Sequence, residues 1–252
     1  MKKIFKYIFA GMAAMSVVAC SEDALETSPS SSVSGNELLG TATNALVSLN
    51  GVYRAMYTAG VSNSSNTHQC FGITAYNLVA DVMGEDCIMN GQGSGWFWYD
   101  CVYNVKSRYT STGWRSYDMW NGYYTWISNV NYILAEEETM SGSETEKNYV
   151  LGQAYAVRAY SYFMLAQMFS RTYKGHESEP CVPLYTEPTD IATEGKGRAT
   201  VEEVYQQITS DLDKAITMLG NSGKRKHISH INEAVASGIN CLLYTSPSPR
   251  DA

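Results

Sequence analysis

The sequence predicts an all-α protein, and two observations lead to this prediction. First, apolar residues recur at helical spacing over long stretches that are separated by polar loops rich in Gly, Pro and Ser. Second, residues 148–169 read NYVLGQAYAVRAYSYFMLAQMF, where apolar and aromatic side chains surround most of the helix. A helix of this kind must be covered on several sides. We therefore expect the other helices to pack around it.

The polar groups of residues 148–169 fit a protein core better than a membrane. Arg158, two glutamines and four tyrosines would each be costly in hydrocarbon, so we do not interpret this stretch as a membrane span. Inside a protein, Arg158 must find a carboxylate or carbonyl partner. Small residues keep parts of the helix surface low and let neighbouring helices approach closely; they are Gly152, Ala154, Ala156 and Ala159.

Residues 1–19 have the pattern of a signal peptide, in which three lysines precede a short apolar run and a group of small residues. Cys20 follows directly. This arrangement resembles a bacterial lipobox, whose cysteine becomes the lipidated first residue of the mature protein. An ordinary secretory signal with an incidental cysteine is the alternative. Labelling cells with a palmitate analogue separates the two, because only the lipobox predicts label that depends on Cys20.

The chain after the signal peptide is acidic. Loss of the three leader lysines leaves 15 basic residues against 25 acidic ones, which argues against nucleic-acid partners. Residues 20–42 begin with a polar, acidic and serine-rich run, and we expect them to form a lipidated flexible tether. Residues 43–240 are long enough for one sizeable folded domain.

Five further helices are predicted from the spacing of apolar residues, over residues 43–57, 70–84, 114–135, 201–219 and 227–243. The fourth has the clearest apolar stripe, and Thr200 and Glu203 form a capping box ahead of it. The residues expected to face inward include Tyr76 and Ala80 in the second helix and Tyr117, Trp120 and Tyr124 in the third.

Residues 172–200 form a long connection that contains several prolines and glycines, and we expect a surface loop with extended pieces. The helices on either side make hairpins of about 35 to 50 residues that follow one another in series. This organisation is typical of tetratricopeptide-type arrays. The predicted fold is therefore an α-superhelix of tetratricopeptide-like hairpins with long irregular loops.

The residues that usually carry catalysis or hold metals form no convincing cluster. His227 and His230 have a spacing that suits a metal, but no carboxylate or thiolate accompanies them, so exposed polar surface is the better interpretation. Asp81, Glu85 and Asp86 are acids at or past a helix end, which are usually solvated. We therefore predict no catalytic residues, no metal site and no cofactor, and the protein is not expected to be an enzyme.

Five cysteines remain besides Cys20. In an exported protein some of them can pair, and free buried thiols are the equal alternative. The four that we consider for pairing are Cys70, Cys87, Cys101 and Cys181.

All five tryptophans fall within residues 96–126. Aromatic rings stack on the apolar faces of sugars, while polar side chains bond the hydroxyl groups. Trp120, Tyr124 and Trp126 have helical spacing and are expected in the core, whereas the rings of the preceding loop can reach a ligand. The candidate ligand-binding residues are Trp96, Trp98, Tyr99, Tyr103, Asn104 and Asp81.

Four segments, in this order behind a lipobox, resemble the SusD/RagB family of outer-membrane nutrient-binding lipoproteins: WNGYYTWISNVNYIL, AYAVRAYSYFMLAQMFSRTYKG with a following VPLY, RATVEEVYQQITSDLDKAI, and HINEAVASGINCLL. The resemblance implies a helical, tetratricopeptide-like fold and a lipid anchor at Cys20 on the cell surface. It also implies a role in passing oligosaccharides, or other nutrients, to a SusC-like TonB-dependent transporter of the outer membrane. Members of the family use no catalytic residues.

The chain departs from this family in length, because members are about twice as long. The ending CLLYTSPSPRDA is similar to a translated cloning sequence. We therefore expect residues 241–252 to be non-native and the chain to be an N-terminal fragment. Two other functions stay open at this point, namely a tetratricopeptide-type scaffold for protein partners on the cell envelope and a secreted glycosidase.

Overall fold

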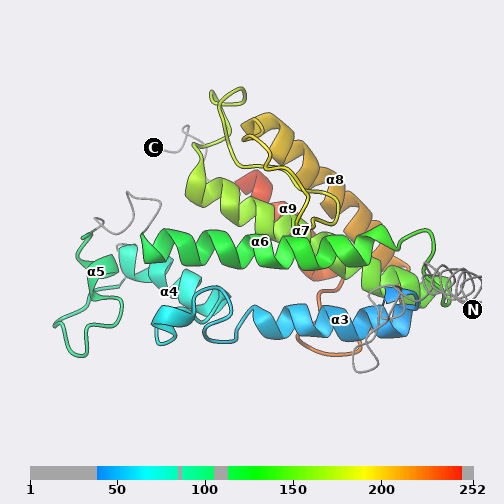
Figure 1. Cartoon of the computed structure of the whole chain (residues 1–252), viewed down its shortest axis with the longest axis horizontal. Coiled ribbons are helices and arrows are strands. Elements are labelled where there is room, and N and C mark those ends of the chain that lie inside the picture. Colours follow the sequence, from blue (N-terminus) through cyan, green and yellow to red (C-terminus); the bar gives the residue numbers. More distant parts are fainter. Residues whose placement is uncertain (1–38, 85–86, 105–112, 246–252) are drawn as a thin grey trace, which may run out of the picture. The chain divides into compact units, whose positions relative to one another are not determined.

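The computed structural model describes residues 39–84, 87–104 and 113–245. These residues are helical and contain no strand, although two isolated bridges join Thr41 to Ser141 and Pro180 to Thr200. The predicted all-α fold is confirmed (Figure 1). The helices are α3 (Ala42–Ala55), η2 (Ser64–Asn66), α4 (Ile73–Met83), α5 (Trp98–Cys101), α6 (Trp114–Ala135), α7 (Glu144–Phe169), α8 (Val201–Gly220) and α9 (Glu233–Thr245).

Helix α7 is the centre of the fold, as its composition predicts. It packs against α3, α6, α8 and α9, and nearly every side chain between Tyr149 and Ala166 is buried (Figure 1). The helix begins four residues earlier than its apolar run. Ser143 and Glu146 form a reciprocal capping box there, which satisfies backbone N–H groups of the first turn.

Gly152 allows close contact between α7 and α8. A Cβ atom at this position would lie 2.8 Å from Cγ of Leu219, well inside normal contact distance. The structure therefore confirms that small residues on α7 let a neighbouring helix approach. None of the described helices is both long and apolar enough to cross a bilayer.

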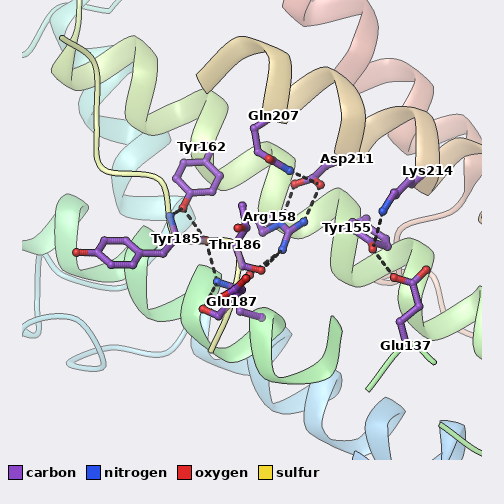
Figure 2. Close-up of polar contacts among 11 residues, drawn as sticks. Glu137, Tyr155, Arg158, Tyr162, Tyr185, Thr186, Glu187, Gln207, Asp211 and Lys214 are labelled. Atoms are coloured by element: carbon purple, nitrogen blue, oxygen red, sulfur yellow. Dashed lines mark hydrogen bonds and ion pairs between the residues drawn. The ribbon is translucent and has the colours of Figure 1, made fainter. Parts of the chain in front are cut away.

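Arg158 finds the buried partner that its position requires (Figure 2). Its guanidinium donates two hydrogen bonds of 2.7 Å to the carboxylate of Asp211 on α8. It also donates to Oδ1 of Asn131 on α6 at 2.9 Å and to the carbonyl of Thr186 at 3.0 Å. One buried cation thus joins three helices and a loop, with a bidentate geometry that suits arginine.

Part of the connection between α7 and α8 is more firmly packed than a surface loop. Cys181 and Val182 are fully buried, and residues 183–189, which we call the strap, lie across α6 and α7. Side chains of these helices donate to strap carbonyls; Tyr162, for example, donates to the carbonyl of Tyr185 at 2.9 Å and accepts from its N–H at 2.7 Å. The predicted surface loop with extended pieces fits most of the connection, because the strap is half-buried or exposed, whereas Cys181 and Val182 are buried.

Several side chains face a different way from the sequence prediction. On α6 the ring of Tyr117 is 51% exposed, while Tyr123 and Trp126 fill the core. On α4, Ala80 is exposed and Ala75 is buried beside Tyr76. Each helix turns its face toward the neighbours it meets, and spacing alone leaves that face uncertain by about one position.

The described residues include little of the two chain ends but contain all four cysteines considered for pairing. The signal peptide, Cys20 and nearly all of the tether lie outside the described residues. Helix α9 continues to Thr245, and the rest of the tail expected to be non-native also lies outside them. The four cysteines considered for pairing are free thiols, of which Cys70 and Cys181 are buried.

Candidate functional site

Residues 95–104, which we call the aromatic loop, present several rings to solvent. The exposed fraction is 48% for Trp96, 57% for Tyr99 and 57% for Tyr103, whereas Trp98 is half-buried. Trp98–Cys101 form the single turn of α5. The neighbouring ring of His68 lies 5.5 Å from that of Trp96, between centroids. Large exposed rings on one short segment are uncommon on a soluble surface unless they meet a ligand or partner.

Two residues of the aromatic loop have left-handed backbone, which is rare for aromatic side chains. Phe97 has a φ of 55° and Tyr103 a φ of 52°, so they flank α5 on both sides. Phe97 is the one ring of the segment that points into the core, where it meets Phe71 edge-on at 6.1 Å. Strained backbone of this kind persists only where surrounding contacts hold it, and it concentrates at functional sites.

Arg115, at the start of α6, holds the aromatic loop from below. Its guanidinium donates to Asp100 at 3.0 Å and to the carbonyl of Gln69 at 2.9 Å, and both charged side chains are buried. The same group lies 4.2 Å from the ring centroid of Trp114 and 5.1 Å from that of Phe97. Gln69 in turn accepts from the N–H of Phe97 at 2.9 Å. The exposed rings therefore belong to a loop that a buried ion pair holds in place.

The far end of the aromatic loop is joined to α4. The hydroxyl of Tyr103 donates to the carbonyl of Met83, the last residue of that helix. Asp81 is exposed on the last turn of α4, and Asn104 is exposed where the loop ends. The structure thus brings the end of α4 and the predicted loop residues into one region, which the sequence treats as separate segments.

A buried polar cluster under this region was missed at the sequence level. Ser62 donates to the carboxylate of Asp118, and Tyr76 donates to Ser62 at 3.2 Å and to the Asp118 carbonyl at 3.0 Å. Burial raises the pKa of Asp118. Burial, together with Asp118, raises the pKa of Cys70 to about 12, so this thiol is a weak nucleophile. The cluster fastens α4 and the polar loop before it to α6.

The described residues contain no cluster suited to metal binding, and of the three acids Asp81, Glu85 and Asp86 the last two lie outside the described residues. No group of three or more His, Cys, Asp or Glu side chains gathers there. His230 is buried and uses both ring nitrogens, at 2.8 Å from the Tyr149 hydroxyl and 2.8 Å from Oδ1 of Asn50. It precedes α9 and is structural, so the expectation of exposed polar surface is wrong for His230 and right for His227. The aromatic loop offers stacking surfaces and hydrogen-bonding groups, which suit binding.

A hollow of about 1170 Å³ lies away from the aromatic loop, since no residue of that loop lines it. It is formed by the end of α7, residues 170–174 and one side of α8. The polar and charged groups around it include Lys174, Asp213 and Lys214. None of the predicted site residues lines it.

The packed helical hairpins define an all-α protein of tetratricopeptide-like type. The family model SusD-like_3, described as starch-binding associating with outer membrane, matches residues 87–242, which is more than half of the chain. The chain therefore belongs to the SusD-like family. No curated protein matches it.

Solved structures agree with this family. A SusD-like carbohydrate binding protein from Bacteroides vulgatus is 28% identical with a TM-score of 0.69, and the match covers 81% of this chain and 42% of that one. A putative sugar binding protein from the same organism is 22% identical, with a TM-score of 0.63 and coverage of 82% and 43%. A laminarin binding SusD-like protein is 22% identical, with a TM-score of 0.55 and coverage of 81% and 40%. The chain thus spans less than half the length of these proteins.

Proposed function

We propose that this chain belongs to a cell-surface lipoprotein that binds oligosaccharides and passes them to a SusC-like TonB-dependent transporter of the outer membrane. The observation that carries the proposal is the aromatic loop, where Trp96, Tyr99 and Tyr103 are about half exposed. The family description names starch and the outer membrane, and one of the similar structures is a laminarin binding protein. Binding is the activity, without catalysis or a cofactor, and Cys20 carries the lipid anchor.

The exposed rings have a definite role in this proposal. Trp96, Tyr99 and Tyr103 offer flat apolar faces to the C–H faces of sugar rings, while Trp98 lends one edge. Asn104 and Asp81 provide the amide and carboxylate that bond sugar hydroxyls. The ion pair between Arg115 and Asp100 fixes the loop before ligand arrives, so that little conformational entropy is lost on binding.

Intrinsic tryptophan fluorescence tests the proposal, because all five tryptophans lie within residues 96–126. The full chain is titrated with linear α-glucans, laminarin oligosaccharides and other oligosaccharides. We expect a saturable change in fluorescence with at least one glycan. Trp96→Ala should bind that glycan about tenfold more weakly, which corresponds to a loss of roughly 1.4 kcal/mol of binding free energy. Tyr244→Ala, which removes a 74% exposed ring on α9, is the matched control and should bind normally.

Two results would contradict the proposal. One is the absence of any response across a broad glycan panel by a chain whose circular dichroism confirms its helices. The other is equal loss of binding in Trp96→Ala and in the α9 control. Release of reducing sugar during the titration would instead indicate a glycosidase. A cross-link between the anchored protein and its neighbouring transporter in cells tests the delivery role separately.

A further inference from the structure

A second hollow, of about 550 Å³, lies between the end of α3, the start of α4 and the connection from α8 to α9. We call it the α3–α4 pocket. Figure 1 shows that this connection passes beside α3, far along the chain from both helices. The volume falls within the range of about 300–1,000 Å³ that is usual for small-molecule sites. None of the candidate residues of the aromatic loop lines it.

Positive charge gathers at this pocket although the whole chain is acidic. Arg54 is a lining residue, and neither Asp nor Glu is among the lining residues. Arg225 and Lys226 are close as well, since burial first, and then the charges of His227, Arg225 and Lys226, lower the pKa of His230 in the pocket wall. The formal net charge of the chain is −7, so such a site stands out. A concave surface with one sign of charge concentrates ligands of the opposite sign.

Helix α4 adds to this charge. Its first residues, Ile73 and Thr74, line the pocket, and no side chain caps its first turn. Gly72 places the helix start against the end of α3, because its φ of 70° brings it so close to the Met56 carbonyl that a Cβ atom would lie 1.9 Å from that oxygen. The N–H of Ile73 donates to that carbonyl at 2.8 Å, so only the N–H groups that follow it in the first turn can meet an anion at the pocket wall, where the positive end of the helix dipole favours one.

The pocket has a rigid floor. Nε2 of His230 lies 2.8 Å from Oδ1 of Asn50, and because an amide oxygen only accepts, Nε2 carries the proton and donates. Nδ1 of the neutral ring then accepts from the Tyr149 hydroxyl, which itself accepts from the N–H of Lys226 at 2.9 Å. The neutral His230 ring also stacks on Tyr53 at 5.4 Å. These contacts fix the floor and leave Arg54 and His227 at the exposed rim.

We propose that the α3–α4 pocket binds a sugar that carries a carboxylate, such as a hexuronic acid at the end of an acidic oligosaccharide. The carboxylate lies between Arg54 and the start of α4, where charge-assisted hydrogen bonds are strongest. The sugar ring rests against Tyr57, whose side chain is 65% exposed beside the pocket. Ser229 and His227 bond the hydroxyl groups. This is a second site, independent of the aromatic loop, and it adds acidic saccharides to the glycans of the proposed function.

Calorimetric titration of the full chain with glucuronate and with its neutral counterpart glucose tests this site. We expect saturable binding of glucuronate, at least tenfold weaker binding of glucose, and weaker glucuronate binding as salt is raised. Arg54→Gln should weaken glucuronate binding at least tenfold. Arg54 is exposed, so this variant is expected to fold, and its thermal melt verifies that. Tyr57→Ala provides a second variant that changes the sugar platform and no charge.

Matched controls separate this site from the aromatic loop. Arg171→Gln removes an exposed arginine that does not line the pocket and should leave glucuronate binding unchanged. Trp96→Ala should also leave it unchanged, even where it abolishes binding of neutral oligosaccharides. The proposal is overturned by equal binding in Arg54→Gln and the native chain, by loss of glucuronate binding in Trp96→Ala, or by displacement of glucuronate by acetate or inorganic phosphate at equal concentration. The last result would indicate a general anion site.

Discussion

Two buried arginines hold two different parts of this molecule. Arg158 makes four hydrogen bonds that tie α6, α7, α8 and the strap together, and two of them form a bidentate pair with Asp211. Arg115 donates at 3.0 Å to Asp100, at 2.9 Å to the Gln69 carbonyl and at 3.4 Å to the Gln69 side chain, and its guanidinium also lies over two aromatic rings. Within the described residues its Nε atom has no hydrogen-bond partner.

The difference between the two arginines separates the framework from the candidate site. Around Arg158, hydrogen-bonding groups are matched in geometry, and the pair joins elements that are far apart in sequence. Around Arg115, cation–π contacts replace part of the hydrogen bonding, and the pair supports one short loop with strained backbone. A buried pair that joins distant helices contributes to the stability of the whole fold, whereas one that joins a short loop to a single helix holds that loop in place. We infer that the free energy of unfolding depends most on α6, α7 and α8, and that Arg115 stabilises the aromatic loop locally.

Arg158→Met is expected to have the largest effect on this comparison. It leaves the Asp211 carboxylate buried without its cation, which costs about 3–5 kcal/mol of unfolding free energy. Urea denaturation followed by circular dichroism measures the loss. Arg171→Ala is the control, because its 3.5 Å pair with Glu179 is exposed and should be worth less than about 1 kcal/mol. Similar losses in both variants would contradict the central role of Arg158.

Gly152→Ala tests how closely the framework is packed. The added Cβ meets Leu219, so we expect a loss of about 1–3 kcal/mol in place of the usual gain in helix propensity. Gly51→Ala on α3 is a matched control, because nothing lies within 4 Å of its Cβ position. That variant should gain about 0.5–1 kcal/mol. Denaturation midpoints that shift in the same direction would refute close contact at Gly152.

Arg115→Met should release the aromatic loop more than the framework. We expect faster proteolytic cleavage within residues 95–104 and a loss of about 1–3 kcal/mol in global unfolding, smaller than in Arg158→Met. Limited proteolysis with mass spectrometry locates the cuts, and urea denaturation measures the global term. Lys147→Ala, which removes a partly exposed pair with Glu144, should change cleavage of the loop not at all and the free energy of unfolding by less than about 1 kcal/mol. Unchanged cleavage of the loop would show that Arg115 does not hold it.

The smallest expected effect concerns pH and His230. Burial, followed by the nearby charges, lowers the pKa of His230 below its ordinary value of 6.5. The unfolded chain therefore takes up this proton first as pH falls below 6.5, and folding stability decreases there until the folded chain is protonated too. The drop in melting temperature between pH 7.5 and 5.5 should be smaller in His230→Gln than in the native chain. His227→Gln should keep most of the native drop, and equal drops in all three proteins would refute the role of His230.

The framework was largely predictable from the sequence because its signals are local. Apolar spacing located α6 and α8 closely, and the lone Arg158 in an apolar helix implied a buried polar partner. The identity of that partner was not predictable, since Asp211 lies 53 residues away in the chain. Among the acids of α8, nothing in the local pattern distinguishes Asp211 from Asp213 except the face on which it lies.

The sequence indicated which kinds of residue form the candidate site, but not the contacts that hold them in place. The aromatic residues between positions 96 and 126 correctly indicated exposed rings. Tyr117, however, is also exposed, and Phe97 is buried in the core. Arg115 gave no signal because it follows a loop, next to Trp114, where an exposed arginine is equally reasonable. Its partner Asp100 and the α3–α4 pocket depend on contacts between distant segments, which no local pattern encodes.

The helices bind the strap mainly through its backbone carbonyl groups. Tyr124, Asn131, Tyr132, Arg158 and Tyr162 donate to its carbonyl groups, and carbonyls are the same whatever side chain a residue carries. The helices thus bind the strap through its main chain, as some proteins bind an extended peptide. Because the strap belongs to the same chain, its effective concentration is high. An exposed strap side chain such as that of Glu187 can then vary, while the length and extended path of the strap are fixed. Deleting one residue should disturb the helices more than replacing the Glu187 side chain, because it shifts every later carbonyl out of reach.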